Sequence, residues 1–100
     1  MADDMVPNPL LPALQQTLRT IEPLIHDMQQ ALTNRAKDFH SGRIWTGPVA
    51  KDFDGELDRH TGRVVHAGEA ILNDLRLQIT RTAEMVTEKD ALRLIRRYEL

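Results

Sequence analysis

Residues 40–48, His-Ser-Gly-Arg-Ile-Trp-Thr-Gly-Pro, separate two long stretches of the chain that are rich in helix-forming residues. Gly42 suits the left-handed conformation in which many helices end, so we expect a first helix to stop there. Gly47 and Pro48 suit the N-cap and first turn of a second helix, because the missing N–H of proline costs nothing at that position. The stretch therefore predicts a corner between two helices at residues 42–47.

The segment before this corner has the apolar spacing of one long helix. Asn8 and Pro9 fit an N-cap and a first helical residue. We expect a flexible lead at residues 1–8, which are polar and proline-bearing, and a helix over about residues 9–41. The apolar positions of this helix recur in steps of three and four, apart from one lapse, and are Leu11, Leu14, Leu18, Ile21, Ile25, Met28, Leu32 and Phe39.

Pro23 lies inside this apolar pattern. A proline in a helix interior removes one backbone hydrogen bond and clashes with the carbonyl one turn earlier. We therefore expect either a kink near residues 19–22 or a fresh helix start capped by Thr20.

The segment after the corner carries a wider apolar stripe, and we expect a second helix over about residues 48–86. Its seam consists of Val49, Phe53, Leu57, Val64, Gly68, Ile71, Leu75, Ile79 and Val86, and it is widened by Val65, Leu72 and Met85. A stripe this broad predicts one packing partner within the hairpin and a second outside it. We therefore expect a dimer interface formed by Val64, Val65, Ile71, Leu72, Leu75 and Ile79.

Residues 87–100 fit either a terminal helix or a tail. The run Thr87-Glu88-Lys89-Asp90 is typical of a helix start, with a threonine cap and an acid three residues later. Residues 88–98 then form a third short helix, although continuation of the second helix fits equally well. The fold class that we predict is all-α, an antiparallel two-helix hairpin that dimerises into a four-helix bundle.

Composition limits the classes of function. One hundred residues fit a single domain, and the absence of cysteine excludes disulfide scaffolds and thiolate metal sites. The net charge of −2 gives no electrostatic case for nucleic acid. Residues 5–18 contain three prolines, so we expect no membrane span, and the acidic start lacks the pattern of a signal peptide. We expect synthesis in the cytoplasm, with any export using a route that does not read an N-terminal signal.

The chemically reactive side chains do not form a catalytic or metal-binding pattern. The histidines lack the helical spacings of metal sites, and they are His26, His40, His60 and His66. The single serine, Ser41, has His40 as its sequence neighbour, an arrangement that rarely supplies a catalytic dyad. The helix dipole explains the acids near the start of the second helix, Asp52, Asp54, Glu56 and Asp58. We expect no enzyme activity, no metal and no cofactor.

The corner also carries a motif. Trp45-Thr46-Gly47 is followed by the small apolar residues Val49 and Ala50 and, eight positions after the tryptophan, by Phe53. This pattern resembles the Trp-x-Gly (WXG) family, the ESAT-like small proteins of type VII secretion. The resemblance implies a turn motif of Trp45, Gly47 and Phe53. From the residues alone, Trp45 fits a large apolar plug at the open end of a helix pair.

The resemblance further implies a secretion substrate, co-substrate or adaptor that acts by helical protein–protein binding. Its partners would be a second copy or another WXG-type protein, together with the type VII secretion machinery. Many members carry a Tyr-x-x-x-Asp/Glu export signal after the second helix, whereas the only tyrosine here is Tyr98, two residues before Leu100. We therefore expect a partner to supply that signal. The alternative is an intracellular helical dimerisation or regulatory module unrelated to secretion.

Overall fold

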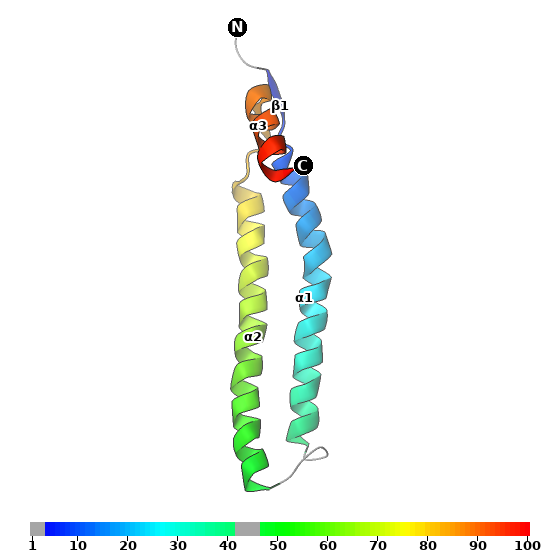
Figure 1. The fold of residues 1–100 in the computed structure, drawn as a ribbon, viewed down its shortest axis with the longest axis vertical. Helices are drawn as coiled ribbons and strands as arrows, with labels where there is room; N and C mark the ends of the chain where they lie inside the picture. Colours follow the sequence, from blue (N-terminus) through cyan, green and yellow to red (C-terminus); the bar gives the residue numbers. More distant parts are fainter. Residues whose placement is uncertain (1–3, 42–46) are drawn as a thin grey trace. The chain divides into compact units, whose positions relative to one another are not determined.

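A computed structural model of the chain describes residues 4–41 and 47–100. The chain is mostly helical, and its two long helices pack against each other as the sequence predicts for a helical hairpin (Figure 1). The elements in chain order are strand β1 (Met5–Pro7), helix α1 (Leu10–His40), helix α2 (Pro48–Arg81), strand β2 (Met85–Thr87) and helix α3 (Glu88–Tyr98).

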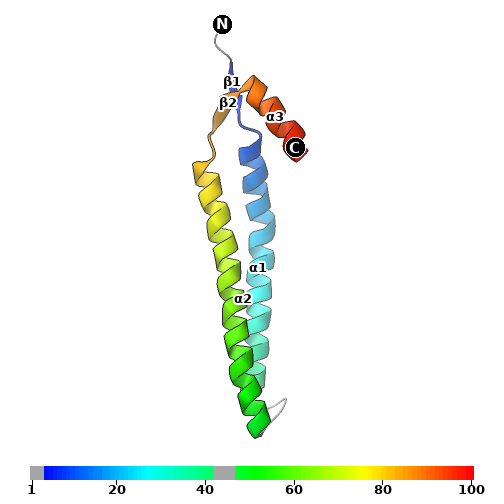
Figure 2. The same cartoon turned by 60° about the vertical axis from the view of Figure 1, so that its left-hand side comes forward.

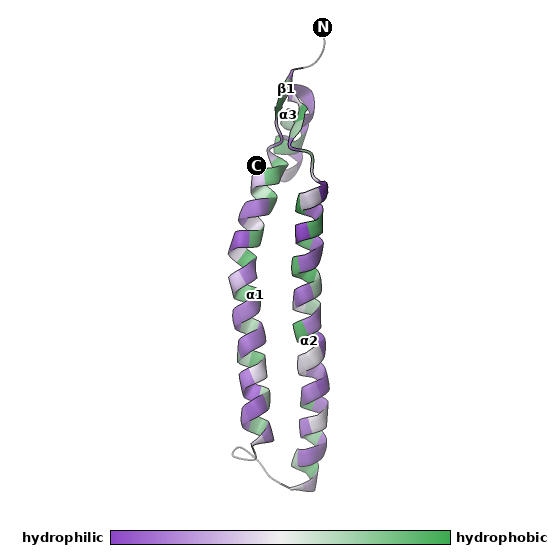
Figure 3. Cartoon of the chain, turned by 180° about the vertical axis from the view of Figure 1, so that it is seen from behind, coloured by the Kyte–Doolittle hydropathy of each residue, from purple (hydrophilic) through white to green (hydrophobic). Residues whose placement is uncertain are grey.

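The chain divides into two compact units. Unit 1 combines Met1–Ile21 with Asn73–Leu100, and unit 2 is Glu22–Leu72. Each unit contains one segment of α1 and one of α2, which run antiparallel beside each other (Figures 1 and 2). Apolar and polar residues are interspersed along the whole length of both helices, as the colouring by hydropathy shows (Figure 3). Each unit is therefore organised around its own helix pair.

Helix α1 starts as predicted, within one residue. The side-chain Oδ1 of Asn8 accepts a hydrogen bond from the N–H of Leu10 at 2.9 Å, which makes Asn8 an N-cap. Helix α1 continues without interruption through Pro23, so a fresh helix start capped by Thr20 is wrong. Pro23 and Arg19 are both exposed. The carbonyl of Arg19, which loses its intrahelical donor at the proline, can therefore be hydrated by solvent.

Two short strands correct our prediction of a flexible lead and of an entirely helical chain. Strands β1 and β2 pair antiparallel, with Val6 opposite Val86. The pairing is extended by a hydrogen bond from the N–H of Asn8 to the carbonyl of Glu84, at 2.8 Å, and by one from Glu88 N–H to Asp4 O, at 3.1 Å. The second helix accordingly ends at Arg81, five residues before the predicted residue 86.

Helix α3 confirms the first of the two alternatives for the C-terminal residues. The Thr87 hydroxyl oxygen accepts a hydrogen bond from Asp90 N–H at 3.1 Å, which is the cap that the sequence pattern predicts. At the other end Glu99 adopts a left-handed conformation, with φ of 54°, and its N–H donates to the carbonyl of Ile95. Both ends of this short helix are therefore fixed.

Small side chains and one leucine form the buried core of unit 2. Leu72 is completely buried, and Ala36 and Ala50 are the other buried apolar residues described in this unit. Gly68 lies where the two helices approach closely, because a Cβ atom built on it would be 2.9 Å from Cγ2 of Ile25. Gln29 is buried beside Gly68 and donates from Nε2 to the carbonyl of Val65 at 2.9 Å. The helices are thus joined by close backbone approach as well as by apolar contact.

Candidate protein-binding surface

The corner motif is described in part. Trp45 lies outside the described residues, so its predicted role as an apolar plug stays a prediction. Gly47 has φ of 113°, a conformation that other residues resist, and its carbonyl accepts a hydrogen bond from Lys51 N–H at 3.0 Å. Gly47 therefore directly precedes α2, at the position that the sequence predicts for the N-cap. Phe53, the third motif residue, packs edge-on against Phe39 of α1, with ring centroids 5.3 Å apart and an interplanar angle of 60°.

His40 at the end of α1 contacts two carboxylates of α2. Its Nδ1 lies 2.5 Å from Oδ2 of Asp54, and its Nε2 lies 3.2 Å from Oδ1 of Asp58. Two acceptors can both be satisfied only by the protonated ring, in which both nitrogens carry hydrogen. The hydrogen bond to Asp58 raises the pKa of His40 above its ordinary value of 6.5, desolvation opposes this, and the charge of Asp54 and its hydrogen bond raise the pKa further.

This contact corrects our explanation of the acidic residues in α2. The first turn of α2 contains no acidic residue, so the helix dipole does not account for the acids that follow. Asp54 and Asp58 instead lie one helical turn apart on α2, and both of their carboxylates contact His40. The pairing could not be predicted from the sequence, because the two carboxylates are 14 and 18 residues away from the histidine, on the other side of the corner.

The predicted dimer residues in unit 2 divide into buried and exposed members. Leu72 is completely buried within the chain, so it belongs to the intramolecular core and is closed to a partner. Val65 is half-buried. By contrast, Val64 is 39% exposed and Ile71 is 54% exposed. Two large side chains of the predicted stripe therefore remain in solvent, and their role as a dimer interface stays a prediction.

Helix α1 contributes two more exposed apolar side chains to unit 2, Leu24 at 62% and Met28 at 45%. Each of the four exposed residues comes one position before an inward-facing one, as Met28 precedes Gln29 and Ile71 precedes Leu72. In two antiparallel helices this offset of about 100° turns the side chains to the same side of the pair. We call this side the outer flank, and it consists of Leu24, Met28, Val64 and Ile71.

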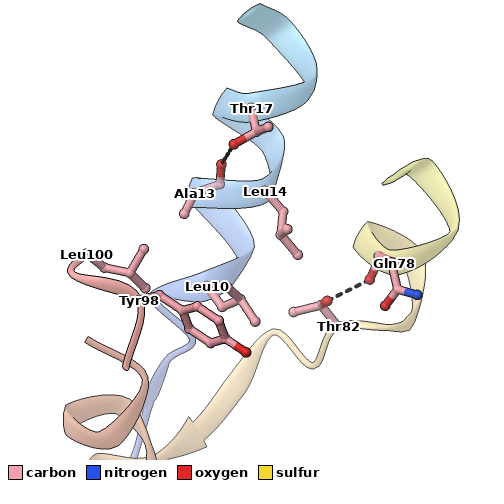
Figure 4. A pocket seen from close by; sticks show the side chains of 8 residues that line it. All are labelled: Leu10, Ala13, Leu14, Thr17, Gln78, Thr82, Tyr98 and Leu100. Carbon is pink, nitrogen blue, oxygen red and sulfur yellow. Dashed lines mark hydrogen bonds between the residues drawn. The ribbon is translucent and has the colours of Figure 1, made fainter. Parts of the chain in front are cut away.

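In unit 1 a hollow of about 380 Å³ lies between α1, α2 and the end of α3 (Figure 4). Its lining is mostly apolar and consists of Leu10, Ala13, Leu14, Thr17, Gln78, Thr82, Tyr98 and Leu100. The two threonine hydroxyls each donate to the carbonyl four residues earlier, those of Ala13 and Gln78, so they are already satisfied. Leu75 and Ile79, the remaining residues of the predicted interface, are half-buried in this unit.

Within residues 4–41 and 47–100, no three His, Cys, Asp or Glu side chains are grouped so as to hold a metal ion. In the same residues no helix is long and apolar enough to cross a membrane. The sequence matches no model of a known protein family, and no curated protein and no solved structure matches the chain.

Proposed function

We propose that this chain acts by helical protein–protein binding, without enzymatic activity, as a WXG-like protein of type VII secretion. In this role it is a substrate, co-substrate or adaptor that pairs with a second copy or with another WXG-type protein. The observation that carries the binding role is the outer flank, where four large apolar side chains are in solvent beside a small core. The sequence motif Trp45-x-Gly47 with Phe53 supports the secretion role.

The outer flank supports pairing on energetic grounds. Full burial of a valine, leucine, isoleucine or methionine side chain contributes about 1.5–3 kcal/mol. The four residues of the flank are each 39–62% exposed, so a large part of that contribution is available to a partner. Because all four lie on one side of the helix pair, one partner helix pair can cover them together, as in a four-helix bundle.

Self-association is tested with one pair of neighbouring substitutions. Sedimentation equilibrium at micromolar concentration should give a mass near twice 11.4 kDa for the unmodified chain. Ile71→Glu should give a monomer, because it places a charge in the centre of the flank. Ala70→Glu introduces the same charge on the exposed side of α2 that lies away from the flank, and should remain dimeric. Equal behaviour of the two variants would exclude the outer flank as the interface.

The secretion role is tested separately. The chain should reach the medium of a host with a type VII secretion system, in the presence of a WXG-type partner that bears a Tyr-x-x-x-Asp/Glu tail. It should stay in the cells when the ATPase of that system is deleted. A chain that pairs through the outer flank but is retained in both hosts would favour the alternative of an intracellular dimerisation or regulatory module.

A further inference from the structure

Helix α3 presents a second apolar surface, which is separate from the outer flank. Its inner side packs on β1 and β2 (Figure 2), with Ala91 buried and Leu94 half-buried. On its outer side Leu92 is 52% exposed, and Ile95 is exposed beside it. The cap at Thr87 and the left-handed residue Glu99 fix both ends of the helix. A short helix held in this way presents its outer side chains in a constant arrangement.

Three cations lie to one side of Leu92 along α3. A hollow of about 260 Å³ is lined by Lys89, Leu92, Arg93 and Arg96. The cations are four and three residues apart, so they follow one line along about two turns of the helix, roughly 10 Å in length. The lining therefore combines one apolar side chain with three cations, which suits an apolar side chain that has carboxylates next to it.

The cations have few partners within the chain. Arg93 pairs with Asp90 at 3.3 Å across one turn of the same helix, with both side chains well exposed. No carboxylate in the described part of the chain pairs with Lys89 or Arg96. Helix α3 has four basic and two acidic residues, so its own net charge is +2, whereas the whole chain carries −2. The positive surface is therefore local to this helix.

We infer that the outer side of α3 binds an acidic amphipathic helix of a partner protein. An apolar side chain of that helix enters the hollow over Leu92, and its carboxylates pair with Lys89, Arg93 and Arg96. Charge complementarity of this kind supplies orientation and specificity. A bilayer fits less well, because Ala91 and Leu94 are already packed on the strands and the chain as a whole is acidic. The inference does not depend on self-association through the outer flank.

The test uses a capped 18-residue peptide in which leucines at helical spacing are flanked by glutamates, labelled for fluorescence anisotropy. The matched peptide has glutamine in place of each glutamate. The full chain should bind the acidic peptide at least about tenfold more tightly than the glutamine peptide, as expected when roughly 1.4 kcal/mol of binding energy depends on the charges. Binding should weaken as salt is raised. NMR shifts should be largest at the backbone amides of α3.

Two double variants locate the site. Lys89→Glu with Arg96→Glu should weaken peptide binding at least about tenfold. Arg63→Glu with Arg81→Glu makes the same change in charge on exposed positions of α2 and should leave binding unchanged. Circular dichroism melts verify that both variants are folded, and sedimentation of the same samples reports self-association independently. Equal loss in both variants, or tighter binding to vesicles of phosphatidylglycerol and phosphatidylcholine than to the peptide, would overturn the inference.

Discussion

His40 shows how one side chain joins the two long helices near the corner. It lies in the last turn of α1, where a positive charge is favoured by the helix dipole, and its two nitrogens face two carboxylates of α2. Asp54 has one oxygen, Oδ1, that is buried without a hydrogen-bond partner in the described residues. Its other oxygen, Oδ2, contacts Nδ1 of His40.

This contact predicts that stability falls as pH rises. The folded state raises the pKa of His40, so its contribution is fully present below the ordinary value of 6.5 and is lost as pH rises through the higher folded pKa. Urea midpoints of the unmodified chain and of His40→Gln should therefore differ at pH 5.5 and converge at about pH 8.5. NMR titration of the His40 ring checks the direction of the pKa shift.

His26 serves as the comparison for that experiment. It lies 3.7 Å from Glu69, with both side chains about half exposed, and it has one carboxylate neighbour where His40 has two. His26→Gln should therefore change the urea midpoint less than His40→Gln does at pH 5.5, since single exposed ion pairs contribute little. A difference between the unmodified chain and His40→Gln that is constant from pH 5.5 to 8.5 would mean that His40 packs but does not act through its charge.

At the scale of elements, the close approach of α1 and α2 depends on Gly68. A Cβ atom there would lie 2.8 Å from Nε2 of Gln29 and 2.9 Å from Cγ2 of Ile25. The amide of Gln29 can move away only by giving up its bond to the carbonyl of Val65, which would leave a buried polar group unpaired. Close packing therefore favours glycine at this position, although glycine weakens the helix by up to about 1 kcal/mol relative to alanine.

We predict that Gly68→Ala destabilises the chain in spite of the better helix propensity of alanine. Overpacking costs about 1–3 kcal/mol and propensity returns up to about 1 kcal/mol, so the net loss should be roughly 0–3 kcal/mol. Gly62→Ala is the matched control, because a Cβ atom at Gly62 meets nothing within 4 Å. It should stabilise the chain in the same urea titration. Stabilisation by both substitutions would show that the helices are farther apart at Gly68.

The sequence predicted the elements whose signals are local. The start of α1, the first residue of α2 and the cap of α3 follow from Asn8, Gly47-Pro48 and Thr87, where one or two residues determine the backbone. Strands β1 and β2 could not be predicted in this way, because they are three residues long and Val6 pairs with Val86, 80 positions away. The pairing of His40 with Asp54 and Asp58 could not be predicted for the same reason, because it depends on how two helices pack against each other.

The sequence also could not tell which residues of the predicted interface are buried within the chain and which are exposed. Periodicity gives the width of an apolar stripe but does not tell which edge of it faces the neighbouring helix. Leu72 and Ile71 are adjacent in sequence, and the structure buries the first completely and leaves the second in solvent. The surface of α3 that carries Leu92 and the cations could not be predicted either, because the exposure of Leu92 depends on the packing of Ala91 on the strands.

At the scale of the whole molecule, the described residues bury little for a chain of this length. Leu72 is the only large side chain among them that is completely buried, whereas thirteen large apolar side chains are exposed. Domains of this size are marginally stable, with folding free energies of about 5–15 kcal/mol. Because the buried core is small, we expect the folding free energy to depend on a partner that covers the exposed apolar residues.

This imbalance predicts that thermal stability depends on protein concentration. If two copies cover each other's outer flank, unfolding is coupled to dissociation, and each tenfold rise in concentration stabilises the dimer by about 1.4 kcal/mol. Shared between two chains of 100 residues, this raises the melting temperature by roughly 3–6 °C. Melts by circular dichroism at 5, 50 and 500 μM should show this rise for the unmodified chain and for Ala70→Glu. Ile71→Glu should melt lower and at one temperature throughout, because a monomer has no mass-action contribution. A melting temperature of the unmodified chain that stays constant over the hundredfold range would mean that the chain folds alone, and that the outer flank is kept for a different protein.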